Sequence, residues 1–414
     1  MEVYLVGGAV RDELLGLPVK ERDWCVVGAT PQELEAQGYR RVGKEFPVFL
    51  HPETGEEYAL ARTERKTGRG YHSFEFRTSP DVTLEDDLAR RDLTVNAMAK
   101  DADGNVIDPF GGREDLQKRV LRHVSEAFGE DPVRILRVAK FAARFRQHGF
   151  AVAEETLELM RCMVEDGEAN ALAPHRVWKE TEAALAADAP QVYFETLRAC
   201  GALAAVFPEI DALFGVPQPE KWHPEIDCGV HTLLVLEQAA LLSPAVDVRF
   251  AALVHDLGKG TTAKDKLPSH PGHERRSVRL IKKMDDRLPL PAACRELALA
   301  VAEFHGQAHR AFELRPSTVL KLIERTDALR RPERFAKFLL ACEADSRGRT
   351  GLEERPYPQA AYLRGALDVV AAVSPREFVM QGMDGAQIGD ALRRKRLQAL
   401  GAYKAQARPT ATAS

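Results

Sequence analysis

The sequence predicts an α+β protein in which a strand-containing N-terminal part, up to about residue 125, precedes a largely helical remainder. Short apolar runs alternate with turn residues in the first part, for example at residues 46–50, 57–62 and 105–108. From residue 126 onward, Leu, Ala, Arg and Glu recur at a spacing of three to four, interrupted by Pro and Gly, and residues 217–219 and 222–224 look like a linker. A chain of 414 residues is long enough for two to four domains with their own cores.

Composition limits the expected location and partners of the chain. Apolar residues make up 45% and charged residues 29%, as in globular proteins, and we find neither a signal-peptide pattern nor an apolar run long enough for a membrane span. The six cysteines lack CxxC spacing, which predicts reduced thiols in the cytoplasm. Because the formal net charge is −4, local basic patches must hold any RNA partner.

The first predicted element is a buried strand at residues 3–6 that turns into a helix at residues 9–15. Gly7 and Gly8 allow a sharp turn and a close approach of the backbone to a phosphate. Arg11 and the helix N-terminus then face an anion. The alternative is an ordinary strand-turn-helix without a ligand.

The next predicted strand covers residues 23–27, directly after an acidic pair. Residues two apart share a face of a strand, so Glu21 and Asp23 can point at the same ion. Hard oxygen ligands suit Mg²⁺. A phosphate-binding turn beside a metal-binding pair predicts nucleotidyl transfer, because this reaction needs fixed phosphates and divalent cations.

Two basic segments extend this hypothesis. Arg90 and Arg91 precede Asp92 in residues 84–97, where they either contact phosphate or ribose, or belong to an exposed, salt-bridged helix. Asp131 and Pro132 are typical of a helix start, and a ridge of basic residues at steps of three follows them. That ridge consists of Arg134, Arg137 and Lys140.

The pair Asp131 and Arg134 also suits recognition of a nucleotide base. A carboxylate can accept from an exocyclic amine, and an arginine can donate to a ring acceptor. Cytosine and adenine carry that amine, so such a pair favours CTP and ATP.

Five segments in this order resemble the motifs of class II tRNA nucleotidyltransferases, the CCA-adding enzymes. They are the Gly8 to Arg11 loop, the Glu21-x-Asp23 pair, residues 90–92, residues 108–110 and residues 130–134. The resemblance implies a polymerase-β-like head with a mixed sheet. It also implies that Gly8, Arg11, Arg91, Arg137 and Lys140 bind nucleotide and that Glu21 and Asp23 hold catalytic Mg²⁺. Glu21 and Lys140 replace the usual Asp and Arg, which we expect to attenuate rather than abolish their contacts.

The helical half contains a second group of candidate ligands. An apolar run ends in His255-Asp256-Leu-Gly-Lys259, which resembles the HD phosphohydrolase signature, with His231 upstream. Asp345 is the expected closing ligand, and His273 and His305 are possible further ligands. Gly306 stands where we expect an acidic residue. We interpret His223, His270 and His309 as structural histidines.

A nucleotidyltransferase head with an HD domain resembles the bacterial multifunctional type of CCA-adding enzyme. The implied domains are a head (1–125), a helical neck and body (126–222), an HD domain (223–350) and a helical tail (351–414). The implied partners are the tRNA 3′ end, CTP and ATP, and the implied metals are Mg²⁺ and, at the HD site, Ni²⁺. The HD activities would be phosphatase, 2′-nucleotidase and 2′,3′-cyclic phosphodiesterase, in a monomer or homodimer.

Two other functions stay open. A poly(A) polymerase would share the head, and an HD phosphohydrolase could use the head only to bind RNA. The basic residues 63–71 are either an active-site element or a solvated loop. The basic residues 393–396 are a candidate tRNA contact.

Overall fold

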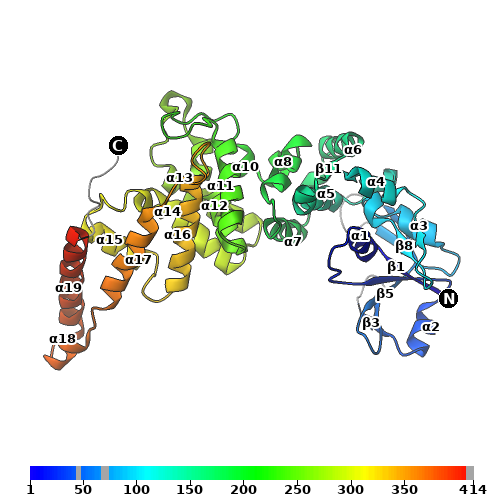
Figure 1. Cartoon of the computed structure of the whole chain (residues 1–414), viewed down its shortest axis with the longest axis horizontal. Coiled ribbons are helices and arrows are strands. Elements are labelled where there is room, and N and C mark those ends of the chain that lie inside the picture. Colours follow the sequence, from blue (N-terminus) through cyan, green and yellow to red (C-terminus); the bar gives the residue numbers. More distant parts are fainter. Residues whose placement is uncertain (43–47, 67–73, 407–414) are drawn as a thin grey trace. The chain divides into compact units, whose positions relative to one another are not determined.

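The computed structural model describes residues 1–42, 48–66 and 74–406, and the chain forms two compact units (Figure 1). Unit 1 comprises Met1–Val206, and unit 2 comprises Phe207–Ser414. Unit 1 contains the strands and unit 2 is built from helices, so the predicted α+β class is confirmed.

Seven strands in the described part of unit 1 form one mixed sheet. The pair β2–β5 is parallel, whereas the other neighbouring pairs are antiparallel. In spatial order the strands are β3 (Arg40–Val42), β4 (Val48–Leu50), β5 (Glu57–Leu60), β2 (Asp23–Val27), β1 (Glu2–Val6), β8 (Ala99–Lys100) and β9 (Val106–Ile107).

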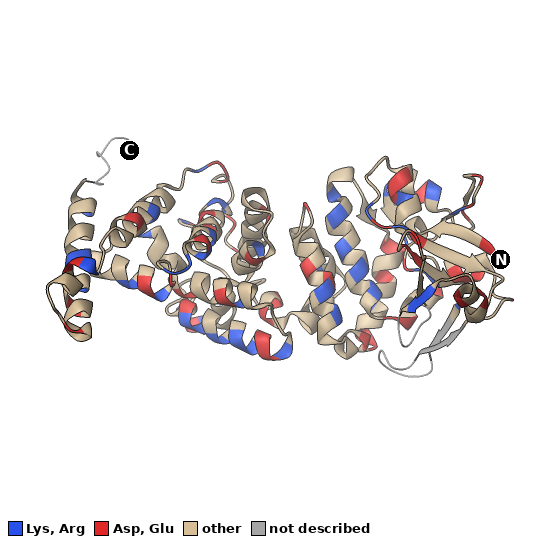
Figure 2. Cartoon of the chain, turned by 90° about the horizontal axis from the view of Figure 1, so that it is seen from below, with Lys and Arg blue, Asp and Glu red and all other residues tan. Residues whose placement is uncertain are grey.

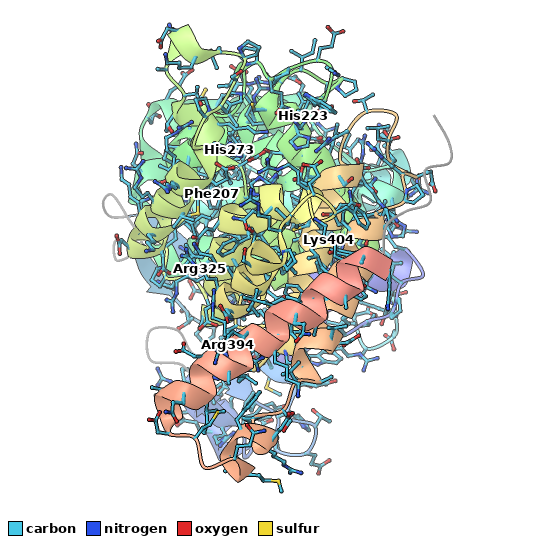
Figure 3. All side chains as sticks on the ribbon, turned by 90° about the vertical axis from the view of Figure 1, so that its left-hand side faces the viewer. Phe207, His223, His273, Arg325, Arg394 and Lys404 are labelled. Carbon is cyan, nitrogen blue, oxygen red and sulfur yellow. The ribbon has the colours of Figure 1, made fainter. Side chains whose placement is uncertain are left out.

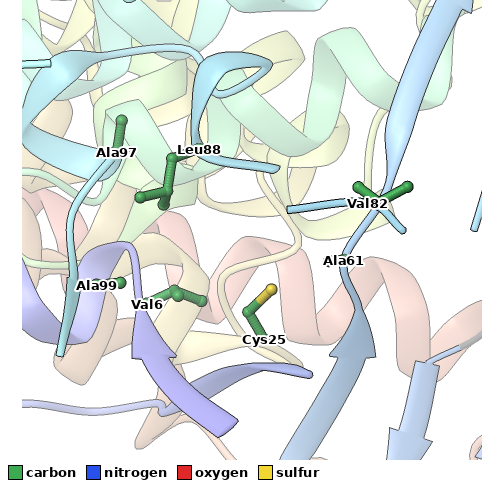
Figure 4. Close-up of a cluster of buried hydrophobic side chains, with 7 residues drawn as sticks. All are labelled: Val6, Cys25, Ala61, Val82, Leu88, Ala97 and Ala99. Atoms are coloured by element: carbon green, nitrogen blue, oxygen red, sulfur yellow. The ribbon is translucent and has the colours of Figure 1, made fainter. Parts of the chain in front are cut away.

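The central strand β2 is buried on both faces. Cys25 belongs to one apolar cluster, together with Val6, Leu88 and Ala99 (Figure 4). Val26 points to the opposite face and packs with Leu34, Phe49 and Leu60. Packing on both faces fixes the register of β2 and therefore the position of the acidic residues at its start.

The predicted strands at residues 3–6, 23–27, 57–62 and 105–108 are confirmed, with small differences in length. The strand predicted at residues 46–50 is described only as Val48–Leu50. A hairpin of β6 (Thr63–Lys66) and β7 (Phe74–Arg77) contains the start of the basic segment 63–71, whereas residues 67–71 of that segment lie outside the described residues. The polar C-terminal tail after residue 408 lies outside them as well.

Helices cover the rest of unit 1. The helix expected across residues 84–97 is shorter, because α3 ends at Ala89 and a 3₁₀ turn, η1 (Thr94–Asn96), follows. A short parallel pair, β10 (Val120–Leu121) with β11 (Ala151–Val152), spans the predicted boundary at 125. The helices are α1 (Gly8–Leu14), α2 (Pro31–Ala36), α3 (Leu84–Ala89), α4 (Gly112–Lys118), α5 (Val133–Phe145), α6 (Glu154–Glu165), α7 (Pro174–Leu185), α8 (Gln191–Ala199) and α9 (Ala202–Val206).

Unit 2 is helical, and its long helices pack around small apolar side chains. Val235 and Ala239 of α11 meet Ala252 of α12 and Ala344 of α16 in one buried cluster, which lets these helices approach closely. The helices are α10 (Pro208–Asp211), α11 (Cys228–Leu242), α12 (Val246–Val254), α13 (His273–Arg287), α14 (Ala292–His309), α15 (Pro316–Arg325), α16 (Pro332–Arg347), α17 (Pro358–Ala371), α18 (Arg376–Met380) and α19 (Gly385–Gln406).

Residues 217–224, which look like a linker in the sequence, belong to the body of unit 2. Gln218 is buried, its backbone N–H donates to Ile226, and its side-chain oxygen accepts from Lys259 at 2.8 Å. Because Gln218 is buried and hydrogen-bonded within unit 2, the linker interpretation is wrong. Proline-rich composition indicates an irregular backbone, but it does not show whether that backbone is buried.

The last helix, α19, carries the basic residues 393–396 and ends near Lys404 (Figure 3). Arg393 pairs with Glu324 at 3.2 Å, and Lys395 pairs with Glu377. Acidic and basic residues are interspersed along the helices of both units (Figure 2). No helix within the described ranges has both the length and the apolar character needed to cross a membrane. No disulfide joins any of the six cysteines, all of which are described.

Candidate active sites

A cavity of about 970 Å³ in unit 1 brings together the residues predicted to bind nucleotide and the pair predicted to bind Mg²⁺. Residues from the strand β2, the turn before α1, the segment after α3 and the helices α5 and α7 line it. The predicted residues among them are Gly8, Arg11, Glu21, Asp23, Arg91, Asp131, Arg134, Arg137 and Lys140.

The turn between β1 and α1 needs glycine for two reasons. Gly7 has φ +72°, a conformation that L side chains rarely adopt. A Cβ at this residue would also lie 2.8 Å from Nη1 of Arg91. The absence of a side chain therefore lets the Arg91 guanidinium lie against the turn, where both can face a phosphate.

Arg11 is buried and held in place. Its guanidinium donates to Asp12 at 2.8 Å and to Asn96, and it stacks 4.9 Å from the centre of the Phe145 ring. The second oxygen of Asp12 accepts from Arg144 at 2.8 Å. Because one carboxylate orients two arginines, Asp12 is a positioning residue that the sequence analysis missed.

Glu21 precedes β2, and Asp23 begins it. Both line the cavity, and both are exposed. The partial loss of hydration beside the cavity wall raises the pKa of Asp23; the positive charge of Arg91 opposes this rise, and the negative charge of Glu21 adds to it. A carboxylate whose charge is disfavoured by a neighbouring carboxylate is a fitting ligand for a divalent cation, so Glu21 and Asp23 fit the Mg²⁺ that the sequence predicts.

Asp87 orders the arginine pair after α3. It accepts from Arg90 at 2.6 Å and from Arg91 at 3.0 Å. Burial opposes the ionisation of Asp87, but the two arginines outweigh this effect and lower its pKa to about 2. The alternative of an exposed, salt-bridged helix is therefore correct only in part: α3 is a helix whose Glu85 and Asp86 are exposed, but the carboxylate that holds both arginines is buried.

Asp131 and Arg134 have partners other than each other at the start of α5. Asp131 accepts two bonds from Arg176 of α7, at 3.0 and 2.7 Å, and one from the backbone N–H of Val133. Arg134 donates to the backbone carbonyls of Ala127 and Arg90. Arg176 is thus a further lining residue, and no local pattern in the sequence links it to Asp131.

Carboxylates also hold the rest of the basic ridge of α5. Arg137 donates to the buried Asp92 at 2.7 Å, and Lys140 donates to Glu180 of α7 at 2.6 Å. In total, ten basic and eight acidic side chains line the cavity. The small positive excess suits a polyanion, and the ion pairs hold the arginines in place before a ligand arrives.

Unit 2 contains a compact cluster of histidines and aspartates from five segments. Nε2 of His231 (α11) lies 3.1 Å from Oδ1 of Asp345 (α16), and Nε2 of His255, after α12, lies 3.2 Å from Oδ2 of Asp256. Nε2 atoms of His273 (α13) and His305 (α14) lie 3.2 and 3.5 Å from Oδ1 of Asp256. The structure therefore joins all six predicted HD-site residues in one place.

Each histidine of this cluster is oriented by a backbone carbonyl. Nδ1 of His231 lies 2.9 Å from the carbonyl oxygen of Gly348, and Nδ1 of His255 lies 2.7 Å from that of Ala252. Nδ1 of His273 lies 2.9 Å from the carbonyl oxygen of His270, and Nδ1 of His305 lies 3.0 Å from that of Val301. An imidazole that donates from Nδ1 presents a free electron pair at Nε2, which is the form that binds metal.

The charges in this cluster attract a cation. Burial lowers the pKa of His255, but Asp256 and Asp345 outweigh it and raise the pKa to about 10. Nε2 of His255 and Oδ1 of Asp256 are buried and make no hydrogen bond within the described part of the chain. Two buried polar atoms without partners among six converging ligands fit a bound metal ion.

Several residues to which the sequence analysis gave no role at this site surround the cluster. Lys259 donates to Oδ2 of Asp256 at 2.7 Å, and Glu225 lies 3.0 Å from Nδ1 of His231. His309, which we interpreted as structural, lies 2.6 Å from Oδ2 of Asp345. Only Lys259 stands in a recognisable pattern, next to the His-Asp pair.

Fold and site together define an enzyme with a nucleotidyltransferase head and an HD phosphohydrolase domain. Residues 3–122 match the family model of the poly A polymerase head domain, and residues 229–331 match that of the HD domain. Residues 149–214 match a model described as a probable RNA and SrmB-binding site of polymerase A. These ranges do not fix the domain boundaries at 125, 222 and 350, which stay predictions.

The chain belongs to the multifunctional CCA protein family. It is 64% identical to the protein of that name from Thioalkalivibrio sulfidiphilus, over 98% of this chain and 99% of the relative. It is 62% identical to the one from Alkalilimnicola ehrlichii (98% of each) and 58% identical to one from Pseudomonas fluorescens (99% and 100%). The resemblance seen in the sequence is thus confirmed.

Solved structures of CCA-adding enzymes share the fold. One bound to CTP has a TM-score of 0.64 at 21% identity, over 96% of this chain and 87% of the other. The Thermotoga maritima enzyme complexed with tRNA has a TM-score of 0.61 at 20% identity, over 98% and 91%.

Proposed function

We propose that unit 1 adds C, C and A to the 3′ end of tRNA, using CTP and ATP and no nucleic-acid template. The observation that carries the proposal is that one cavity contains both the acidic pair Glu21 and Asp23 and the basic ridge of α5. We infer the substrates from the membership of the chain in the multifunctional CCA protein family. Solved enzymes of this fold are described in complex with CTP, ATP and tRNA.

The lining residues have distinct tasks in this proposal. The terminal 3′-hydroxyl oxygen attacks the α-phosphorus and pyrophosphate leaves. Glu21 and Asp23 would hold Mg²⁺, which neutralises developing charge. The glycine turn with Gly8, together with Arg11 and Arg91, receives the phosphates. Arg137 and Lys140 contact the nucleotide.

Base selection falls to Asp131 and Arg134. Arg176 presents the Asp131 carboxylate in a fixed orientation, with both oxygens held. Oδ1 also accepts from the backbone N–H of Val133, whereas Oδ2 keeps a lone pair for an exocyclic amine. CTP and ATP offer that amine, whereas UTP and GTP offer a carbonyl.

For unit 2 we propose metal-dependent hydrolysis of phosphate esters, as phosphatase, 2′-nucleotidase and 2′,3′-cyclic phosphodiesterase. His231, His255, Asp256 and Asp345 would hold the metal, with Ni²⁺ as the proposed ion. Imidazole and carboxylate ligands suit a divalent transition metal. The four histidine Nδ1 atoms near carbonyls support this role, because they leave Nε2 available.

The remaining proposals concern binding and location. The helical body at residues 126–222 and the basic residues 393–396 would contact the tRNA backbone. The protein would act in the cytoplasm as a monomer or homodimer.

The decisive test is extension of a tRNA that lacks its 3′ CCA, with Mg²⁺ and each nucleoside triphosphate alone and in combination, resolved to single nucleotides. We expect two additions with CTP and a third only when ATP is also present. Long tails with ATP alone would instead identify a poly(A) polymerase. Hydrolysis without any extension would favour an HD phosphohydrolase whose head only binds RNA.

A further inference from the structure

One face of α13 carries exposed basic side chains that have no acidic partner. The helix contains six basic and three acidic residues, and four of the basic ones lie together on one exposed face. None of these four side chains forms an ion pair or a hydrogen bond within the described part of the chain. We call them the basic face of α13, which consists of Arg275, Arg279, Lys282 and Lys283.

Other basic residues around this helix are neutralised by carboxylates. Arg287, in the last turn of α13, pairs with Glu209 at 2.8 Å, and Arg295 of α14 pairs with Asp285 at 3.2 Å. Of the acidic residues of α13, only Asp286 is exposed, and it lies at the far end of the helix. The charge of the basic face therefore remains available to a polyanion from outside the chain.

The basic face begins beside the histidine and aspartate cluster of unit 2. His273 is the first residue of α13, and its Nε2 lies 3.2 Å from Oδ1 of Asp256 (Figure 3). Arg276 fixes the start of the helix, because it donates to the carbonyls of Gly258 at 3.0 Å and Pro271 at 2.7 Å. At a rise of 1.5 Å per residue, the basic face extends from about 3 to about 15 Å along the axis from His273. A chain that follows this face therefore brings its end to the cluster.

An exposed tryptophan also lies near the cluster. The side chain of Trp222 is exposed, and Nζ of Lys221 lies 4.9 Å from the centre of its ring. The next residue, His223, packs edge-on against His231 of the cluster, with ring centres 4.6 Å apart. Basic surfaces combined with exposed aromatic rings are typical of sites for single-stranded nucleic acid, because the cations hold phosphates while the bases stack on the rings.

We propose that the basic face of α13 binds the backbone of a single-stranded RNA and that Trp222 stacks a base near its end. Unit 2 would then hydrolyse a phosphate ester at the end of an RNA chain in preference to a free nucleotide. A row of cations about 12 Å long is longer than one phosphate needs, which favours a chain of phosphates. This inference rests on the metal-dependent hydrolysis proposed for unit 2, and it adds the class of substrate and the surface that binds it.

The test compares two substrates that contain the same reactive group, with Ni²⁺ and the full chain. One is free 2′,3′-cyclic AMP, and the other is a short single-stranded RNA that ends in a 2′,3′-cyclic phosphate. In both, water attacks phosphorus, one bond from phosphorus to a ribose oxygen breaks, and that oxygen takes a proton. Hydrolysis reports only on RNA that reaches unit 2, so RNA bound at unit 1 does not contribute.

The test variant neutralises most of the basic face by the triple substitution Arg275→Gln, Arg279→Gln and Lys282→Gln. For the RNA, four phosphate contacts predict that kcat/KM of the wild-type protein falls about 50-fold between about 50 and 200 mM salt, whereas the one contact left in the variant predicts about threefold. For cyclic AMP, kcat/KM should be the same in both proteins. A matched control removes the same charge from exposed residues elsewhere in unit 2 and should behave like the wild type: Lys321→Gln, Arg355→Gln and Arg364→Gln.

The role of Trp222 has its own variants. Trp222→Ala should lower kcat/KM about tenfold for both substrates, because each contains a base that can stack on the ring. Trp222→Phe should restore most of this loss, since it keeps an aromatic ring. An unchanged kcat/KM in Trp222→Ala would overturn the stacking role.

The other outcomes separate this inference from the proposed hydrolysis. Hydrolysis of the RNA that the triple substitution leaves unchanged at low salt would overturn the inference and leave the hydrolysis intact. Equal loss for both substrates would also overturn it, because the effect would then concern folding or catalysis. Loss of CMP incorporation into tRNA without loss of RNA hydrolysis would overturn it by assigning the basic face to the reaction of unit 1. If the wild-type protein hydrolyses neither substrate, the proposed hydrolysis fails and the inference fails with it.

Discussion

The two sites use charged side chains in opposite ways. In and behind the wall of the cavity of unit 1, buried carboxylates hold arginine or lysine side chains, as Asp92 holds Arg137 and Glu180 holds Lys140. In the cluster of unit 2, the carboxylates face imidazoles, and Oδ1 of Asp256 has no hydrogen bond in the described chain. Ion-paired arginine and lysine side chains that line a large cavity suit the binding of a large polyanion. Imidazole nitrogens and carboxylate oxygens that converge on one point suit the binding of a small cation.

If the two sites act independently, a substitution in one site should leave the activity of the other site unchanged. Asp23→Ala should lower CMP and AMP incorporation by about 1,000-fold, because a lost metal ligand removes several kcal/mol of transition-state stabilisation. Hydrolysis of a 2′,3′-cyclic phosphate by the same protein should not change. Asp256→Ala should give the reverse pattern. Parallel loss of both activities in either variant would contradict the separation.

A second comparison concerns two glycines next to the metal cluster. A Cβ on Gly258 would lie 2.1 Å from the carbonyl oxygen of His273 and 2.7 Å from the backbone nitrogen of Ser277. Gly258→Ala should therefore displace α13 and lower the free energy of unfolding by about 3 kcal/mol or more.

Gly306 is the matched control for this substitution. A Cβ there meets its nearest neighbour, Oε1 of Glu274, at an ordinary 3.5 Å. Because Gly306 lies inside α14, Gly306→Ala should stabilise the protein by about 0.5–1 kcal/mol. Urea unfolding measures the free energy of unfolding of both variants. An equal change in the two variants would show that α13 can shift to accept a Cβ at Gly258 without loss of stability.

The ion pairs of unit 1 should respond to pH. The pKa of Asp87 is about 2 in the folded protein, below its ordinary value, so its stabilising contribution is complete above pH 4 and disappears as the pH falls toward 2. Asp87→Asn should cost about 2 kcal/mol at pH 7 and progressively less below pH 4. Urea unfolding as a function of pH measures this change.

Glu85→Gln on the same helix is the control, because Glu85 is exposed and surface substitutions stay within about 0.5 kcal/mol. A penalty at Asp87 that does not depend on pH would mean that packing, and not charge, explains the effect.

Local patterns predicted much of the fold and the site. The glycine turn, the strand at residues 23–27 and the basic ridge of α5 each depend on residues within about a dozen positions, where strand and helix periodicity are informative. Contacts between distant residues escaped this reasoning. Arg176 holds Asp131 from 45 positions away, and His309 reaches Asp345 from 36 positions away. Residues 217–224 were misread because a buried Lys259 draws Gln218 inward.

The ligand set of unit 2 has a mechanical consequence. His231, His255, His273, His305 and Asp345 come from five segments separated by up to 114 positions along the chain. No disulfide joins the cysteines of this chain, so coordinate bonds at this cluster would be its strongest cross-links between distant segments. An ion bound there would connect the helices of unit 2 through its ligands, and its removal would destabilise the packing of α11, α13, α14 and α16 together.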